Sequence, residues 1–202
     1  MSKSAVTNAD AIPEDARAAG SAAADVKSPN VKSGEFKTGE AKSEEAKPAP
    51  AKQASPKVKE YETKSSAGTV EIGRKLAEML TPPRLMILRG DLGAGKTTLV
   101  KGIATALGAA EADEVTSPTF TLVHEYSGSL DGKPIKLLHL DLYRLDSERQ
   151  LESLGLEEMQ TPDALILIEW GEKFKSIKKR ADGEIVITSA GGDTRKIVVT
   201  LN

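Results

Sequence analysis

The segment GDLGAGKT, from Gly90 to Thr97, limits what the 202-residue chain can fold into more than any other segment does. It matches the pattern G-x-x-x-x-G-K-[S/T] at every fixed position. Backbone N–H groups of such a loop surround a polyphosphate, and its glycines permit the close approach. Lys96 would place its charge on the β- and γ-phosphates, and the hydroxyl of Thr97 would bind Mg²⁺. The loop therefore predicts a site for a nucleoside triphosphate with magnesium.

The segments around this loop have the pattern that such a site requires, a strand before it and a helix after it. Residues 85–88 (LMIL) form a short, fully apolar run, which is typical of a strand buried on both faces. The segment TLVKGIATALG that follows the loop predicts a helix that ends at Gly108. Residues 65–80 also have apolar side chains at helical spacing, with Ser65 or Ser66 as the N-cap.

Further apolar segments predict the rest of a sheet. Strands are expected at residues 121–126, 135–143, 164–170, 184–188 and 195–201. Asp131 and Gly132 form the turn that joins the first two of these strands, and the last two form a C-terminal hairpin. Residues 147–159 predict one more helix. Because strands and helices alternate through the middle of the chain, the predicted fold class is α/β, a partly parallel sheet flanked by helices.

Residues 1–60 have a different composition, dominated by Ala, Lys, Glu, Ser and Pro. Such a segment cannot bury enough apolar surface to offset its chain entropy, so it is predicted to be a disordered low-complexity tail. The folded domain is then expected to span residues 61–202. The chain has no cysteine, which excludes disulfides and cysteine zinc sites. It also has no run of about 18 apolar residues, so we expect a soluble cytoplasmic protein with no membrane partner.

Two of the predicted apolar strands end in an acidic residue. LLHLD ends in Asp141, and LILIE ends in Glu169. In α/β sheets, ligands bind at the carboxyl ends of the strands, so either acid could hold the metal ion, directly or through water. The alternative is that each acid only ends its strand in solvent. Trp170, the one tryptophan, either covers the site or packs in the core.

Three further features have both a functional and a structural interpretation. The loop TSPTF, residues 116–120, is either a switch loop near the γ-phosphate or an ordinary connection. His124 and His139 lie inside predicted strands, where a histidine is more often structural, and neither is assigned a role. The basic cluster KFKSIKKR, residues 173–180, could contact phosphate but is interpreted as a solvated face.

Four segments together resemble one family. GDLGAGKTT, TSPTFTLVHEY, HLDLYRL and LIEW occur in the order and spacing of the TsaE (YjeE) family, small bacterial ATPases of tRNA threonylcarbamoyladenosine biosynthesis. The resemblance covers residues 65–201 and implies a P-loop NTPase-like sheet with helices around it and antiparallel strands at one side. It also implies ATP and Mg²⁺ as cofactors. The expected activity is that of an ATPase that is slow alone and depends on partner proteins.

The resemblance also implies which partners these are. Members of this family work with the TsaD and TsaB proteins, which transfer a threonylcarbamoyl group to adenosine 37 of tRNAs that read codons starting with A. The ATPase does not modify the base itself. Contact with tRNA is therefore expected only through the complex.

The same resemblance implies roles for residues of this chain. Mg²⁺ would be held by Thr97 and Glu169, and Lys96 would contact the phosphates. Asp141 would support hydrolysis by positioning water or a water-bound metal ion. The residues expected to contact the nucleotide are Leu92, Gly93, Ala94, Gly95, Lys96, Thr97, Thr98, Ser65, Thr119, Trp170 and Arg195.

The phosphate loop alone leaves three other functions open. A small-molecule kinase, for nucleosides or nucleotides, could use Arg144 and Arg149 on its acceptor, although no arginine-rich lid segment follows the loop in the sequence. A guanine-nucleotide switch would need an N-K-x-D segment, and the sequence has none. The third alternative is a structural protein with a vestigial loop, which would bind no nucleotide.

Overall fold

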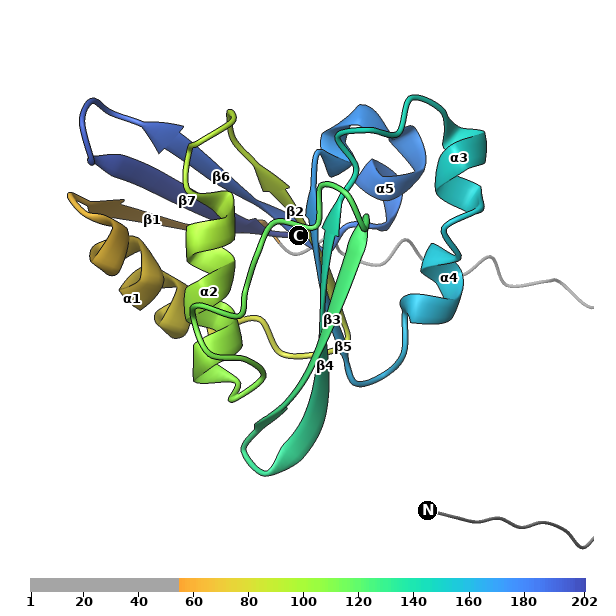
Figure 1. Ribbon diagram of the computed structural model, residues 1–202, viewed down its shortest axis with the longest axis horizontal. Helices are drawn as coiled ribbons and strands as arrows, with labels where there is room; N and C mark the ends of the chain where they lie inside the picture. Colours follow the sequence, from red (N-terminus) through yellow and green to blue (C-terminus); the bar gives the residue numbers. More distant parts are fainter. Residues whose placement is uncertain (1–54) are drawn as a thin grey trace, which may run out of the picture. The chain divides into compact units, whose positions relative to one another are not determined.

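The computed structural model describes residues 55–202, and the predicted disorder of residues 1–54 lies outside this part of the chain. The described residues form a seven-stranded sheet with the strand order β1-β7-β6-β2-β5-β4-β3 (Figure 1). Its strands are Lys57–Thr63 (β1), Arg84–Arg89 (β2), Val123–Leu130 (β3), Lys133–Asp141 (β4), Ala164–Glu169 (β5), Gly183–Ser189 (β6) and Arg195–Leu201 (β7).

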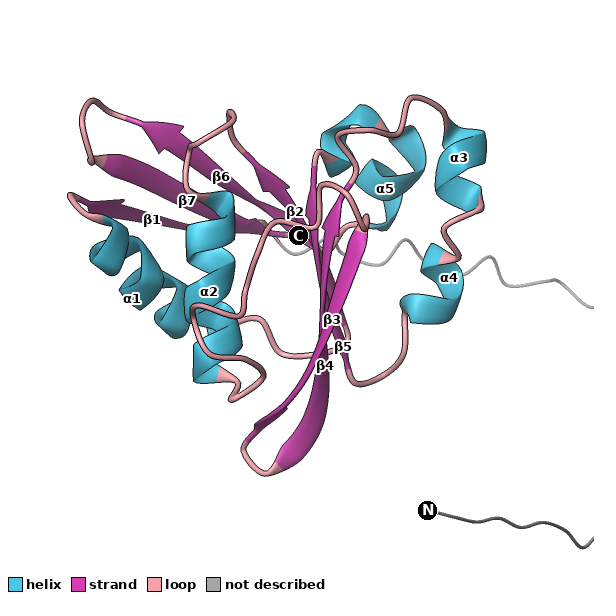
Figure 2. Ribbon diagram, viewed as in Figure 1, coloured by secondary structure: helices cyan, strands magenta, loops and turns pink. Residues whose placement is uncertain are grey.

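The centre of this sheet is parallel and both of its sides are antiparallel (Figure 2). β2 pairs in parallel with β5 and with β6, and β4 pairs in parallel with β5. The hairpin of β3 and β4 extends one side, while β6, β7 and β1 run antiparallel on the other. This arrangement confirms the predicted α/β class, with a partly parallel sheet, antiparallel strands and a C-terminal hairpin.

Helices flank the sheet, with α1 and α2 together on one side and α3, α4 and α5 on the other (Figure 1). They span Ser66–Ala77 (α1), Lys96–Ala106 (α2), Glu148–Glu152 (α3), Leu156–Met159 (α4), Gly171–Lys173 (η1, a 3₁₀ turn) and Lys175–Arg180 (α5). None of these helices, within the described residues, has the length and apolar composition needed to cross a membrane.

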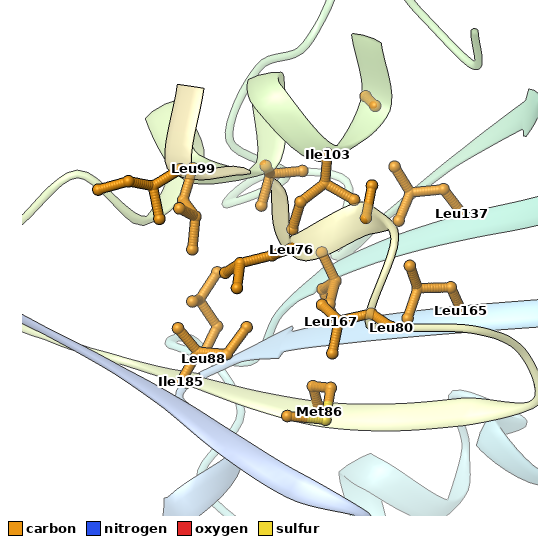
Figure 3. Close-up of a cluster of buried hydrophobic side chains, with 14 of the residues drawn as sticks. Leu76, Leu80, Met86, Leu88, Leu99, Ile103, Leu137, Leu165, Leu167 and Ile185 are labelled. Atoms are coloured by element: carbon orange, nitrogen blue, oxygen red, sulfur yellow. The ribbon is translucent and has the colours of Figure 1, made fainter. Parts of the chain in front are cut away.

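The side chains of the central strands enter two apolar clusters, one on each face of the sheet. On β2, Met86 and Leu88 join residues of α1 and α2 in the first cluster, whereas Leu85 and Ile87 belong to the second, with residues of α3, α4 and α5. Figure 3 shows the first cluster, which includes Leu76 of α1. Residues 85–88 of β2 and 164–168 of β5 are therefore all apolar, because both faces of these strands are covered.

The first strand corrects the predicted domain boundary. β1 begins at Lys57, so residues 57–60, which were predicted to belong to the disordered tail, are part of the sheet. Most side chains of its sequence KVKEYET are exposed, and the strand is held by backbone pairing with β7 at the edge of the sheet. An edge strand of this kind carries charged side chains, so its composition does not distinguish it from a solvated tail.

Gly155 divides the helix that was predicted for residues 147–159. It has a φ value of 68°, in the left-handed region that favours glycine, so α3 ends before it and α4 begins after it. The helix predicted over residues 65–80 is shorter than expected and ends at Ala77. Apolar residues continue at helical spacing past each of these ends, which is why periodicity alone overestimates the length of the helices.

The turn predicted at Asp131 and Gly132 is confirmed. Both residues have positive φ values, 51° and 74°, as a two-residue hairpin turn requires. Because the turn is so short, β3 continues to Leu130 and β4 begins at Lys133, so both strands reach further toward the turn than their apolar patterns indicate.

Two glycines allow α1 and α2 to contact each other backbone to backbone. A Cβ atom on Gly102 would lie 2.0 Å from the carbonyl oxygen of Val70, and one on Gly73 would lie 2.3 Å from that of Leu99. We expect Gly102→Ala to lower the free energy of unfolding by about 1–3 kcal/mol, as overpacking does. In an uncrowded helix the same change would raise it by about 1 kcal/mol. Urea denaturation followed by circular dichroism tests this packing, and a more stable variant would contradict it.

Candidate functional site

The loop between β2 and α2 has glycine at positions where other residues would be strained. Gly90, Gly93 and Gly95 have φ values of 152°, 77° and 105°. A Cβ atom on Gly90 would also lie 2.5 Å from the carbonyl oxygen of Ile187 in β6. The chain turns sharply out of β2 and opens α2 at Lys96. The predicted context of the loop, a strand before it and a helix after it, is therefore present.

The side chain of Lys96 lies inside the loop and is 6% exposed. Its Nζ donates hydrogen bonds to the carbonyl oxygens of Gly90 (2.9 Å) and Asp91 (3.1 Å), and lies 3.5 Å from Oε2 of Glu169. The ammonium group is also 4.9 Å from the ring centroid of Trp170. The N-terminus of α2 adds a partial positive charge at the same place. The loop thus combines one full charge with a helix dipole, which is the electrostatic requirement for binding phosphate.

Asp141 and Glu169 end neighbouring parallel strands and lie opposite each other in the register of β4 and β5. They are 3% and 4% exposed, so neither acid simply ends its strand in solvent. Oε1 of Glu169 accepts a hydrogen bond from the hydroxyl of Thr97 at 3.4 Å and lies 2.9 Å from Nε2 of His139. The pairing of β5 with β2 therefore places Glu169 beside the loop, where it contacts Thr97, the other residue predicted to hold the metal ion.

Asp141 connects the loop of residues 116–120 to the carboxyl end of β4. Its Oδ2 accepts hydrogen bonds from the hydroxyls of Thr119 (2.6 Å) and Ser117 (3.2 Å). Its Oδ1 accepts the backbone N–H of Tyr143 at 3.0 Å. The segment for which the sequence left a switch loop and an ordinary connection open is therefore in direct contact with an acid of the site.

These groups line one cavity of about 530 Å³, a size suited to a small-molecule ligand. The cavity is lined by Leu92, Gly93, Gly95, Lys96, Thr97, Thr98, Ser117, Thr119, Asp141, Tyr143, Glu169 and Trp170. The structure therefore brings together all the residues predicted for the site except Ala94, Ser65 and Arg195.

The three exceptions lie around this cavity rather than in its wall. Ala94 is a buried residue of the loop itself, and its carbonyl oxygen accepts a hydrogen bond from Nε of Arg195 at 3.0 Å. Arg195 thus supports the loop backbone from β7 and lines a smaller cavity of about 90 Å³, which shares Gly93, Gly95 and Thr98 with the first one. Ser65 lines neither cavity, and its hydroxyl caps α1 by accepting the backbone N–H of Gly68 at 3.0 Å.

Trp170 both lines the site and packs against the core, the two alternatives that the sequence left open. Its ring lines the cavity, and the side chain also packs against the second apolar cluster. A φ value of 63° turns the backbone at Trp170 into η1, directly after Glu169. The ring of Tyr143 lies against the indole with a centroid distance of 5.2 Å and an interplanar angle of 54°. Two aromatic rings therefore form part of the cavity wall.

Three residues at or beside the site have no role in the sequence-based prediction: His139, Tyr143 and Lys173. His139 is two residues from Asp141 on β4, so the alternation of side chains along a strand places both on one face and could have revealed it. Lys173 is exposed, as expected for the solvated face of residues 173–180. Its Nζ also donates hydrogen bonds to the carbonyl oxygens of Tyr143 (2.8 Å) and Leu145 (2.7 Å), and so ties the segment after β4 to η1. The sequence pattern does not predict this contact, because the acceptors are backbone carbonyl groups, which every residue has.

The donors at this site suit a magnesium ion. Thr97 and Glu169 offer two hard oxygen ligands whose Oγ1 and Oε1 atoms are 3.4 Å apart. Across residues 55–202, no three His, Cys, Asp or Glu side chains gather into a cage that could hold a metal ion by themselves. Mg²⁺ usually takes one or two protein ligands and completes its shell with water and phosphate oxygens. The residues present therefore fit a cation that arrives with a nucleotide.

A parallel sheet with a phosphate loop between one strand and the next helix, and with acids at the ends of neighbouring strands, defines a protein of the P-loop NTPase type. The family model described as "Threonylcarbamoyl adenosine biosynthesis protein TsaE" matches residues 63–197. The chain belongs to this family, TsaE. The resemblance carried by the four sequence segments is thereby confirmed.

Several curated relatives carry the name tRNA threonylcarbamoyladenosine biosynthesis protein TsaE. The one from Bacillus subtilis (strain 168) is 36% identical over 71% of this chain and 86% of its own length. The one from Haemophilus influenzae is 43% identical over 56% of this chain and 71% of its own length. The one from Treponema pallidum is 36% identical and is matched over 97% of its length. The crystal structure of Bacillus subtilis YdiB matches with a TM-score of 0.53 and 32% identity, over 74% of this chain and 88% of that chain.

Proposed function

We propose that this protein is an accessory ATPase of tRNA threonylcarbamoyladenosine formation. It binds ATP with Mg²⁺, hydrolyses it slowly alone and acts in the cytoplasm with the TsaD and TsaB proteins, which modify position 37 of tRNAs that read codons starting with A. Contact with tRNA is made through that complex. The observation that carries the ATPase activity is the meeting of Lys96, Thr97 and Glu169 in one cavity. Membership of the TsaE family supports the pathway.

The residues of the cavity share the work of transferring a phosphoryl group to water. The loop N–H groups and Lys96 hold the β- and γ-phosphates at the N-terminus of α2. Thr97 and Glu169 hold the cation, which supplies positive charge to the phosphate oxygens when it is bound. Asp141 orients the attacking water as a hydrogen-bond acceptor, and its contacts with residues 116–120 fix its carboxylate.

The kinase alternative has no comparable support. The guanidinium of Arg144 lies 4.2 Å from the ring centroid of Phe120, and Arg149 is an exposed residue of α3. Neither arginine lines the cavity, so neither is placed to bind an acceptor beside the phosphates. The relatives named for tRNA threonylcarbamoyladenosine biosynthesis support the first function instead.

The proposed function is tested by phosphate release from Mg-ATP. The purified protein is assayed alone and with TsaD and TsaB from the same source, and a Lys96→Ala variant is assayed in parallel. We expect slow release by the protein alone, faster release with its partners and none above background in the variant. Release that is unaffected by TsaD and TsaB, but that requires a small-molecule acceptor, would overturn the proposal in favour of a kinase.

Asp141→Asn separates nucleotide binding from hydrolysis. The amide keeps the size of the side chain, and its oxygen can still accept from the two loop hydroxyls. Its nitrogen cannot accept the backbone N–H of Tyr143, and the amide is a poor acceptor for a water proton. We expect the rate of ATP hydrolysis to fall about 100-fold, within the range measured for general bases. The affinity for a non-hydrolysable ATP analogue should stay within a factor of about three, because the phosphate contacts are unchanged. A variant that hydrolyses ATP normally would remove Asp141 from the reaction.

A further inference from the structure

A buried histidine lies beside the site, and the proposed reaction does not use it. His139 is 0% exposed in β4, in the alternating row that begins with Ile135 and Leu137 and ends at Asp141. Both apolar members of this row belong to the first cluster. A buried imidazole must satisfy its N–H group, which an aliphatic side chain in the same row does not need to do. The histidine therefore has a polar partner that explains it better than packing does.

That partner is the carboxylate of Glu169. Nε2 of His139 lies 2.9 Å from Oε1 of Glu169. Because a carboxylate oxygen only accepts, Nε2 is the donor. The register pairs His139 with Leu167, so Glu169 is its diagonal neighbour two residues further along β5. The other ring nitrogen, Nδ1, has no hydrogen-bond partner within residues 55–202. All of the hydrogen bonding of this side chain is therefore directed at the acid.

We propose that His139 is a positioning residue that fixes the carboxylate of Glu169 for the metal–nucleotide complex. Thr97 and Lys96 also contact that carboxylate, at 3.4 Å and 3.5 Å. In the proposed reaction, however, both of them turn to the cation and the phosphates. His139 is buried and does not line the cavity, so its hydrogen bond to the acid is expected to persist when the site is loaded. This role rests on the proposed binding of Mg-ATP.

Hydrogen bonds of this kind, to a residue that itself binds the metal ion, typically change metal affinity by about 10- to 100-fold when they are removed. We therefore expect His139→Leu to weaken the Mg²⁺-dependent part of nucleotide binding by about 10-fold or more. Binding of the nucleotide in EDTA should be unchanged, because His139 contacts neither the loop nor the phosphates. A residue that only fills the core would instead tolerate leucine, which matches its neighbours Ile135 and Leu137.

Two polar variants make the test specific for one nitrogen atom. In glutamine, the amide nitrogen is as many bonds from Cα as Nε2 is in histidine, so His139→Gln can still donate to Glu169. In asparagine, the amide nitrogen corresponds to Nδ1, so His139→Asn is equally polar but cannot reach the carboxylate. The glutamine variant should retain Mg²⁺ dependence within about threefold of the unchanged protein, and the asparagine variant should resemble leucine.

The full chain provides its own probe, because Trp170 is its one tryptophan and lines the cavity. Its fluorescence is titrated with a non-hydrolysable ATP analogue, in EDTA and at a series of Mg²⁺ concentrations, for the unchanged protein and the leucine, glutamine and asparagine variants. Thermal unfolding followed by circular dichroism shows which variants are folded. If leucine fails to fold, the comparison of glutamine with asparagine decides.

Each outcome bears on one proposal. Loss of Mg²⁺ dependence in the leucine and asparagine variants, with rescue by glutamine, supports the positioning role. Equal Mg²⁺ dependence in all folded variants overturns it, and so does equal loss in glutamine and asparagine. If the unchanged protein itself binds the analogue no better with Mg²⁺ than in EDTA, the proposed Mg-ATP site is wrong, and the role of His139 is overturned with it.

Discussion

Replacing Lys96 with alanine is expected to reduce ATP hydrolysis by about 100- to 1,000-fold, the effect of removing one preorganised group that stabilises transition-state charge. The ammonium group is almost fully buried and lies between the loop carbonyls and Glu169, so solvent does not screen it as it would a surface lysine. Its loss should weaken Mg-ATP binding as well, because the same charge contacts the phosphates in the ground state. Phosphate release and fluorescence titration measure the two effects separately.

The fold should survive this change. Glu169 keeps its hydrogen bonds to Thr97 and His139, so its carboxylate is not left without partners. Lys101→Ala is the matched control, because it also removes a positive charge from α2. Lys101 lies on the same helix but does not line the cavity. Hydrolysis by Lys96→Ala at the rate of this control would show that the lysine does not act on phosphate. A large loss in both variants would point to the helix rather than to the lysine.

The elements around the site were predictable because local chemistry determines them. The loop needs glycine at Gly90 and Gly95 to adopt its φ values, and these are two of the fixed positions by which its pattern is recognised in the sequence. β2 and β5 are covered on both faces, so residues 85–88 and 164–168 appear as fully apolar runs. Once these two strands are placed in parallel, the position of Glu169 beside the loop follows from the sheet.

Contacts made through the backbone were not predictable in this way. β1 is attached by pairing with β7, and its charged side chains resemble those of the segment before it. Lys173 was assigned to a solvated face and Arg195 to the nucleotide, and the sequence did not predict that each also donates to a backbone carbonyl oxygen. A carbonyl acceptor is present at every residue, so such a contact has no signature in the sequence. It depends on which segments the fold brings together.

Glu169→Gln is expected to weaken nucleotide binding when metal is present but not when it is absent. The amide keeps the shape of the side chain but removes the charge that would hold Mg²⁺. The Mg²⁺-dependent affinity should therefore fall by about 100-fold, which is the largest loss typical of removing a residue that only hydrogen-bonds to a metal ligand. In EDTA, however, the carboxylate 3.5 Å from the lysine ammonium repels the phosphates and competes for that ammonium. Removing its charge should leave binding in EDTA as tight as before or make it tighter.

This difference between the two conditions distinguishes a metal ligand from a residue that only supports the site, because a disrupted site would lose affinity under both conditions. Fluorescence titration in EDTA and in excess Mg²⁺ measures both, with thermal unfolding as the check on folding. Asp141→Asn is the comparison, since Asp141 is the paired acid at the end of β4 and lacks a contact with Thr97 among the described residues. If Asp141→Asn rather than Glu169→Gln abolishes the response to Mg²⁺, Asp141 is the main ligand, and Glu169 serves only to balance the charge of Lys96.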